Sequence, residues 1–220
     1  NRVFPEEPGQ DGPTAHGLSS EMIEIRVPPS WKDDVPTFME LLTHITMRSR
    51  NPEGVAMSVK RLLIADPSPR NADAAMWRWR AIGSRTLSVI RPLYEHPDSL
   101  PRIAALRAGG GLYDPIAVPY LLEEATSKGA LGIRLDAIEL LESMPRDYRI
   151  EKGLRPLLND KDVEIRLRTA EALVKRDDMS IKKYSIPDKF ELIHVPSEYK
   201  MIYVTQTGYP RIILAGDIEI

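Results

Sequence analysis

The chain has 220 residues, of which 42% are hydrophobic and 28% charged, and its formal net charge is −2 at pH 7. That hydrophobic fraction is enough for a packed core, and the near-neutral charge argues against a general binder of nucleic acid or membrane surfaces. The absence of cysteine excludes disulfides, thiolate nucleophiles and cysteine-ligated metals.

The N-terminal segment predicts an arm, a strand and a helix. Residues 1–18 carry three glycines and three prolines and are expected to form an extended arm. Residues 22–27 then alternate apolar and charged side chains, the period-two pattern of a strand with one buried face. Asp34 begins the helix, whose apolar stripe extends to Ile45.

From residue 51 the pattern is helical. Asn51 followed by Pro52 predicts a helix start, because asparagine caps the first turn and proline lacks only an N–H that has no intrahelical partner there. A second helix is expected over about residues 72–82. The helices that follow are separated by capping aspartates, among them Asp98 and Asp162, and by glycine or proline stops.

A pattern of about 30 residues recurs within this helical block. Residues 154–175 (LRPLLNDKDVEIRLRTAEALVK) correspond to residues 90–108, and residues 114–144 give a third copy. Recurring pairs of short amphipathic helices are typical of a helical solenoid, in which each pair buries its apolar stripe against its neighbours. One arginine per copy recurs in register, and we expect it to contact the turn of the preceding repeat: Arg102, Arg134 and Arg166.

The C-terminal segment again predicts strands. Residues 190–195, 201–205 and 211–215 are short, rich in Ile, Val and Tyr, and separated by turn residues, which indicates an antiparallel meander or hairpin. A lone hairpin is marginal in water, as is a lone strand–helix unit. We therefore expect the two ends to share one hydrophobic core, formed by Ile23, Ile25, Val27, Ile202, Val204, Ile212 and Leu214.

The predicted fold class is α+β, with a solenoid of helix pairs inserted into a small split α+β domain that takes strands from both chain ends. The expected boundaries are an extended arm at 1–18, the split domain at 19–50 and 186–220, and the helical repeats at 51–185. This organisation places both strand-forming segments outside the helical block.

The helical block resembles a known repeat family. Residues 162–173 (DVEIRLRTAEAL) and 114–122 (DPIAVPYLL) are its best matches. They resemble the short HEAT-like repeats also found in phycobilin-lyase-type proteins, over about residues 90–176. That resemblance implies an interaction scaffold and no particular activity.

The flanking segments resemble a second family. Residues 1–5 have the form N-x-x-F-P, residues 22–28 read MIEIRVP, and an apolar helical pattern follows at 38–45. Residues 202–208 and 212–220 have the form of a hairpin with Thr-Gly at its turn and G-D-I-x-I at its close. Together these segments resemble part of the bacterial flagellar basal-body P-ring protein. The resemblance implies a structural, non-enzymatic subunit of the periplasmic ring around the flagellar rod.

No recognisable catalytic or metal-binding pattern accompanies these segments. The four histidines lack ligand spacing such as i, i+4 on one helix: His16, His44, His96 and His194. Adjacent carboxylates on a helix point about 100° apart and do not converge on a substrate. The glycines at 109–111 lack the lysine of a phosphate loop and are interpreted as a helix stop. We expect no enzymatic activity, cofactor, metal or small-molecule substrate.

Residues 76–80 (MWRWR) are the stretch best suited to contact a charged or protein partner. Trp77 and Trp79 are two apart on a helix, so one is expected to face inward and the other outward. We place Trp77 in the interior and Trp79 on the surface. The candidate protein-interface residues are Trp79, Arg78 and Arg80, because tryptophan and arginine are favoured at such sites. Solvated arginines beside a purely structural tryptophan, or stacking on nucleic-acid bases, are the alternatives.

The leading hypothesis is a structural assembly protein, a subunit of a flagellar P-ring-like structure in the periplasm, with protein partners that include further copies of itself in a ring. The alternative is a HEAT-like scaffold or adaptor that binds a protein through its concave surface, the strands serving as end caps. No nucleic-acid partner and no membrane insertion are expected. We interpret the chain, which begins at Asn1, as a mature chain or an excised fragment.

Overall fold

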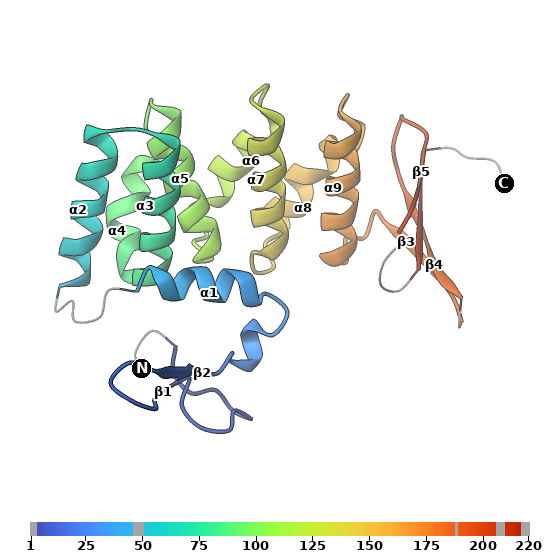
Figure 1. The fold of residues 1–220 in the computed structure, drawn as a ribbon. Coiled ribbons are helices and arrows are strands. Elements are labelled where there is room, and N and C mark those ends of the chain that lie inside the picture. The colour runs from blue at the N-terminus through green and yellow to red at the C-terminus, as the bar shows by residue number, and fades with distance from the viewer. Residues whose placement is uncertain (1–3, 46–50, 188, 206–209, 217–220) are drawn as a thin grey trace. The chain divides into compact units, whose positions relative to one another are not determined.

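The computed structural model describes residues 4–45, 51–187, 189–205 and 210–216 (Figure 1). Over these residues the protein is a mixed α+β structure of helices and two small sheets. The chain divides into two compact units, unit 1 (Asn1–Leu112) and unit 2 (Tyr113–Ile220). Among the described residues, no helix combines the length and apolar character needed to span a bilayer.

Unit 1 begins with a two-stranded antiparallel sheet and continues as helices. Its elements are β1 (Ala15–Gly17), β2 (Ile23–Ile25), the 3₁₀ turn Pro29–Trp31, α1 (Val35–Thr43), α2 (Pro52–Ala65), α3 (Pro69–Ile82), the 3₁₀ turn Ser84–Thr86, α4 (Leu87–Ile90), the 3₁₀ turn Arg91–Leu93 and α5 (Ser99–Gly111). Helix α3 packs against α1, α2 and α5. It is therefore the central helix of the unit.

Side-chain caps explain where the first helices begin. The Asp34 carboxylate accepts a hydrogen bond from the Thr37 N–H at 3.3 Å, and the Asn51 side chain accepts one from Gly54 N–H at 2.8 Å. Ser68 caps α3 in the same way. Each cap satisfies an N–H that has no partner within its helix, and the predicted starts at Asp34 and Asn51 are confirmed.

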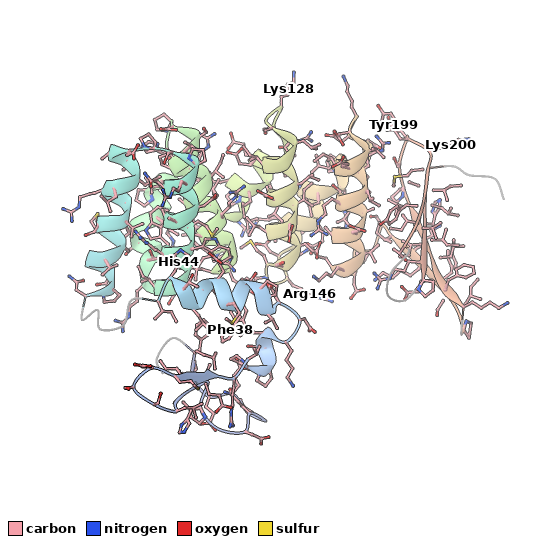
Figure 2. The ribbon with its side chains drawn as sticks, in the orientation of Figure 1. Phe38, His44, Lys128, Arg146, Tyr199 and Lys200 are labelled. Atoms are coloured by element: carbon pink, nitrogen blue, oxygen red, sulfur yellow. The ribbon has the colours of Figure 1, made fainter. Side chains whose placement is uncertain are left out.

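An aromatic cluster fixes the N-terminal segment to these helices. The Phe4 ring packs edge-on against Phe38 of α1, 5.0 Å between centroids, and against Trp31 at 6.0 Å. Phe38 and Leu41 are buried together with Ala81 of α3, and Figure 2 shows Phe38 on the side of α1 nearer the β1–β2 segment. Residues 4–18 are therefore not simply a free arm, because Phe4 is part of the core.

Unit 2 contains helices followed by a four-stranded sheet. Its elements are α6 (Val118–Thr126), α7 (Leu131–Ser143), α8 (Tyr148–Leu154), the 3₁₀ turn Arg155–Asn159, α9 (Val163–Lys175), β3 (Lys182–Ile186), β4 (Phe190–Val195), β5 (Met201–Val204) and β6 (Arg211–Ala215). Helix α7 packs against both α6 and α9. The strand order is β3-β4-β6-β5.

Local structure recurs along the helices at a fixed spacing. Helices α5, α7 and α9 have 13 residues each and begin at Ser99, Leu131 and Val163, which are 32 residues apart. The predicted caps of α5 and α9 are confirmed, because Asp98 accepts from Leu100 N–H at 3.1 Å and Asp162 from Glu164 N–H at 2.8 Å. The same sequence pattern therefore begins both helices in the same way.

The recurring arginines bind different turns from the ones we predicted. Arg102 Nη1 donates to the carbonyl of His96 at 2.9 Å, and Arg166 Nη1 to that of Asp160 at 2.8 Å. Both carbonyls lie six residues earlier, in the turn just before the arginine's own helix, so contact with the preceding repeat's turn is wrong for these two. Arg134 donates from Nε to the Ala125 carbonyl at the end of α6, in its own copy, at 3.0 Å, and pairs with Asp160 of the following copy, so the prediction is wrong for it as well.

The glycines at the end of α5 do more than stop the helix. The helix continues through Gly111. A Cβ placed on Gly109 would lie 2.0 Å from the hydroxyl of Tyr94, which is itself buried. Gly109 is therefore required for the close approach of Tyr94, and the helix ends two residues later.

The strands of the two chain ends belong to separate sheets. β2 pairs antiparallel with β1, whereas the C-terminal strands, among the described residues, pair with one another and not with β1 or β2. Ile23, Ile25, Ile202 and Val204 are all exposed, so the prediction that they face one common core is wrong. Of the seven residues named for that core, Leu214 is buried in the C-terminal sheet, and Val27 packs on the aromatic cluster of unit 1.

The C-terminal sheet also differs from a simple meander. β4 and β6 run parallel, β3 and β5 lie at the edges, and each edge strand is antiparallel to its neighbour. Strand β3 was not among the strands predicted from the sequence. Its two lysines, Lys182 and Lys183, weaken the apolar alternation by which strands are recognised.

Candidate protein-interaction surface

The tryptophan predicted to be exposed is completely buried. Trp79 has 0% of its surface exposed, and its Nε1–H donates to the Ala56 carbonyl of α2 at 3.2 Å. On α3 it shares a helical face with Ala72, Ala75 and Met76, which are also buried. The small Ala56 side chain leaves room for the indole. Trp79 as an interface anchor is therefore wrong.

The other residues of this stretch surround Trp77. The Trp77 ring is half-buried, with the Arg80 guanidinium 4.9 Å from its centroid and the His44 ring stacked at 6.4 Å. Figure 2 labels His44 near the end of α1. Arg78 is exposed. Trp77 thus packs between α1 and Arg80, and Arg78 is the only one of the three predicted interface residues that is fully accessible.

The four-stranded sheet of unit 2 has two different faces. One face, which we call the inner face, carries Lys183, Ile193, Ile213 and Tyr203 in one row across the strands. Lys183 Nζ donates to the Val174 carbonyl of α9 at 2.7 Å, which places this face toward the helices. Ile193 and Ile213 are buried. The inner face is therefore part of the unit 2 core.

The loop before β5 fixes the sheet to the helices as well. Ser197 Oγ donates to the Leu158 carbonyl at 2.8 Å, and Glu198 N–H donates to Asn159 Oδ1 at 2.8 Å. The Arg166 guanidinium lies 4.6 Å from the centroid of the Tyr199 ring, which Figure 2 labels beside Lys200. These contacts hold one side of the sheet against the helices.

The opposite face, which we call the outer face, is apolar and open. Cross-strand pairing puts Tyr184, Leu192, Ile212 and Val204 in one row, and Lys182, His194, the buried Leu214 and Ile202 in the next. Ile202 is 64% exposed, Val204 53% and Tyr184 52%. Contiguous exposed apolar side chains on a protein surface usually mark a contact with another protein.

The two edge strands differ in charge. β3 has the sequence KKYSI, with both lysines exposed, whereas β5 has the sequence MIYV and carries no charge. Edge lysines disfavour pairing with another strand, and an uncharged edge permits it. Of the two edges, β5 is the one suited to pair with a further strand.

A charged hollow of about 310 Å³ lies on unit 2 between α8 and the end of α9. It is lined by Arg146, Asp147, Tyr148, Glu151, Arg155, Arg176, Asp177, Asp178 and Met179. Arg176 is almost fully buried, pairs with Glu151 at 2.7 Å, and donates to the carbonyls of Leu141 and Met144 at the end of α7. The Arg176 guanidinium therefore caps the C-terminal end of α7 and is not directed toward a ligand.

Two aspartates of the hollow are held in their charged form. Burial raises the pKa of Asp178, but hydrogen bonds from Arg155 and Ser180 outweigh it, so that the net pKa lies below its usual range. A hydrogen bond from Lys183 lowers the pKa of Asp177. Carboxylates paired in this way are poor proton donors near neutral pH. Tyr148 and Met179, which line the same hollow, are strongly exposed.

The remaining histidines lie in separate local settings. His96 Nδ1 accepts from the Asp98 N–H at 3.1 Å, and His194 Nε2 lies 3.3 Å from the Gly216 carbonyl. Within residues 4–45, 51–187, 189–205 and 210–216, no three His, Asp or Glu side chains converge as metal ligands would.

No family model matches this sequence, and no curated protein matches it. The candidate surfaces are therefore defined by geometry: the outer face with edge strand β5, and the hollow beside α8. Sequence reasoning missed both. One sequence feature could have indicated the outer face with β5: residues 182–183 are lysines, whereas residues 201–204 carry no charge.

Proposed function

We propose that the protein is a non-enzymatic structural assembly protein, which joins other protein chains through the four-stranded sheet of unit 2. The observation that carries this proposal is an uncharged edge strand, β5, beside an apolar outer face on which Ile202 and Val204 are both more than half exposed. A strand edge offers backbone hydrogen bonds and an apolar face offers buried area, and protein chains use both in assembly.

The specific assembly that we propose is a flagellar basal-body P-ring-like structure in the periplasm. Its support is the resemblance of residues 22–28 and of the hairpin segments to the P-ring protein. β2 lies in the first of these segments, and β5 pairs antiparallel with β6 in the others. The residues of the resemblance at 1–3, 206–208 and 217–220 lie outside the described residues.

The test is co-purification of an epitope-tagged full-length chain with flagellar basal bodies from its native cells. The assembly proposal expects the tag in the basal-body fraction and its loss from that fraction in Val204→Lys, which charges the β5 edge. Ser185→Lys is the matched control, because it adds the same charge at an exposed position of β3 that lies off the outer face. A wild-type chain that never enters the basal-body or envelope fraction contradicts the proposal.

The second candidate function is a HEAT-like repeat scaffold that binds a protein partner on its helices. Two observations favour it: the 32-residue spacing of α5, α7 and α9, and the exposed Tyr148 and Met179 at the hollow beside α8. A photo-crosslinking amino acid at position 179 or at position 202 separates the two functions. Crosslinks to another protein from 179 alone favour the scaffold, and crosslinks from 202 alone favour assembly through the sheet.

A further inference from the structure

The outward backbone groups of β5 follow from its pairing with β6. Thr205 N–H donates to the Arg211 carbonyl of β6 at 3.0 Å. Because successive residues of an antiparallel strand direct their N–H and C=O groups to opposite sides, Tyr203 and Met201 also point toward β6. Ile202 and Val204 then direct their backbone groups away from the sheet, along its open edge.

The side chains of β5 are compatible with a second copy of the same strand. β5 carries no charge, so an identical strand beside it brings no like charges together. In an antiparallel β3–β3 pair centred on Tyr184, Lys182 would oppose Ile186 and Lys183 would oppose Ser185, so that four lysines would be brought into one joint. Self-pairing is therefore disfavoured at β3 and permitted at β5.

We propose that two copies of this chain pair through antiparallel β5 strands, with Tyr203 opposite the same residue of the second copy. This register sets Ile202 opposite Val204 of the second copy and Val204 opposite Ile202. Each of these two pairs exchanges both of its backbone hydrogen bonds, because these residues carry the outward groups. The two four-stranded sheets become one continuous sheet, and their apolar outer faces meet along the joint.

More than one antiparallel register matches the faces and the outward backbone groups of β5, and the opposed side chains favour the one centred on Tyr203. A two-fold axis perpendicular to the sheet maps the outer face onto itself, so a residue must oppose one that lies on the same face. Centring on Tyr203 satisfies this and pairs only apolar side chains across the outer face of the joint. Centring on Ile202 would instead oppose Lys200 to Val204. The inference rests on the proposed assembly function and names the surface and partner that serve it.

The first experiment measures the mass of the purified full-length chain in solution against concentration, by sedimentation or light scattering. The wild type is expected to reach twice the 24.8 kDa of the single chain. Ile202→Lys and Val204→Lys should each raise the dissociation constant of the dimer by roughly tenfold or more. Ser185→Lys, at an exposed β3 position off the outer face, should leave it unchanged. Circular dichroism checks that all three variants remain folded, as expected for side chains that are already exposed.

The second experiment tests the register with single introduced cysteines. Because the chain has no cysteine of its own, any disulfide must form at the introduced position. Residues opposite one another in a non-hydrogen-bonded antiparallel pair have Cα atoms about 4.5 Å apart, within reach of a disulfide. Tyr203→Cys should therefore crosslink two copies under mild oxidation, whereas Tyr184→Cys on β3 should form no crosslink. A crosslink at Ile202→Cys and none at Tyr203→Cys would overturn the proposed register.

The two proposals fail in distinguishable ways. A wild-type chain that is monomeric at every concentration, with Tyr203→Cys uncrosslinked, overturns pairing through β5. If such a monomeric chain still co-purifies with basal bodies, the assembly function holds and depends on contacts other than β5. A dimer that is sensitive to Val204→Lys but absent from the basal-body fraction supports the β5 interface and contradicts the flagellar assignment.

Discussion

Helix α3 and strand β5 both carry large apolar side chains, yet they place them oppositely. In α3, Trp79 lies on the face that packs against α2 and is completely buried. In β5, Ile202 and Val204 lie on the outer face and remain more than half exposed, while Tyr203 turns toward the helices. Apolar character alone therefore does not separate an interior from an interface. What decides is whether a second layer covers the face.

The largest effect is expected for Trp79→Ala. Removing a fully buried indole leaves a cavity and removes the hydrogen bond to the Ala56 carbonyl, which should lower the free energy of unfolding of unit 1 by about 3–5 kcal/mol. Chemical denaturation followed by tryptophan fluorescence measures it, because the remaining Trp31 and Trp77 both lie in unit 1. Trp77→Ala, at a half-buried position, should cost clearly less. Equal losses of unfolding free energy in the two variants would show that the fully buried Trp79 stabilises unit 1 no more than the half-buried Trp77.

The burial of Trp79 shows where sequence reasoning stops. The spacing of Trp77 and Trp79 correctly predicts that they differ in burial, but it does not say which one is inside. That depends on α2, and specifically on Ala56, which is small enough to admit the indole. The caps Asp34, Asn51, Asp98 and Asp162 were predictable because a cap acts within four residues of itself.

The C-terminal sheet shows the same limit for strands. The apolar segments of β4, β5 and β6 were predicted from composition. Their order was not, because the parallel pairing of β4 with β6 places β5 at the edge and joins residues that are distant in sequence. The candidate interface follows from that order. It could be recognised only once the strands were placed.

The contrast between buried and exposed positions applies to arginines as well. Arg176 is 4% exposed and donates to Glu151 and to the carbonyls that end α7. Arg176→Ala leaves those acceptors buried without their donor and should lower the free energy of unfolding of unit 2 by about 3 kcal/mol. Arg78→Ala, on the exposed side of α3, should change stability by less than about 0.5 kcal/mol. Far-ultraviolet circular dichroism during denaturation measures both.

Acid should weaken unit 2 through Asp178. Its folded-state pKa is lowered, with the opposing effect of burial outweighed by the bonds from Arg155 and Ser180. The stabilisation is therefore complete above the unfolded pKa of about 3.9 and is lost as pH falls through the lower folded value. Arg155 is 43% exposed, so solvent screening limits the contribution to roughly 1 kcal/mol.

Asp178→Asn tests this dependence. The variant should be less stable at neutral pH and should lose less stability than the wild type between pH 5 and about pH 3. Tryptophan fluorescence offers an internal control, because it reports on unit 1 and should show no difference between the two chains. A wild-type and variant pH dependence that coincide in the circular dichroism would show that the pair with Arg155 contributes nothing.

The smallest effect on stability is expected for Ile202→Ala. The side chain is 64% exposed and the inner face is unaffected, so the free energy of unfolding at low protein concentration should stay within about 0.5 kcal/mol of wild type. The dissociation constant of the proposed dimer should nevertheless rise, because the Ile202 side chain would be covered only in the pair. Denaturation at dilute protein, set beside sedimentation at high protein, separates the two quantities. A stability loss comparable to that of Trp77→Ala would show that Ile202 belongs to the folded core and that α3 and β5 do not differ in the way described above.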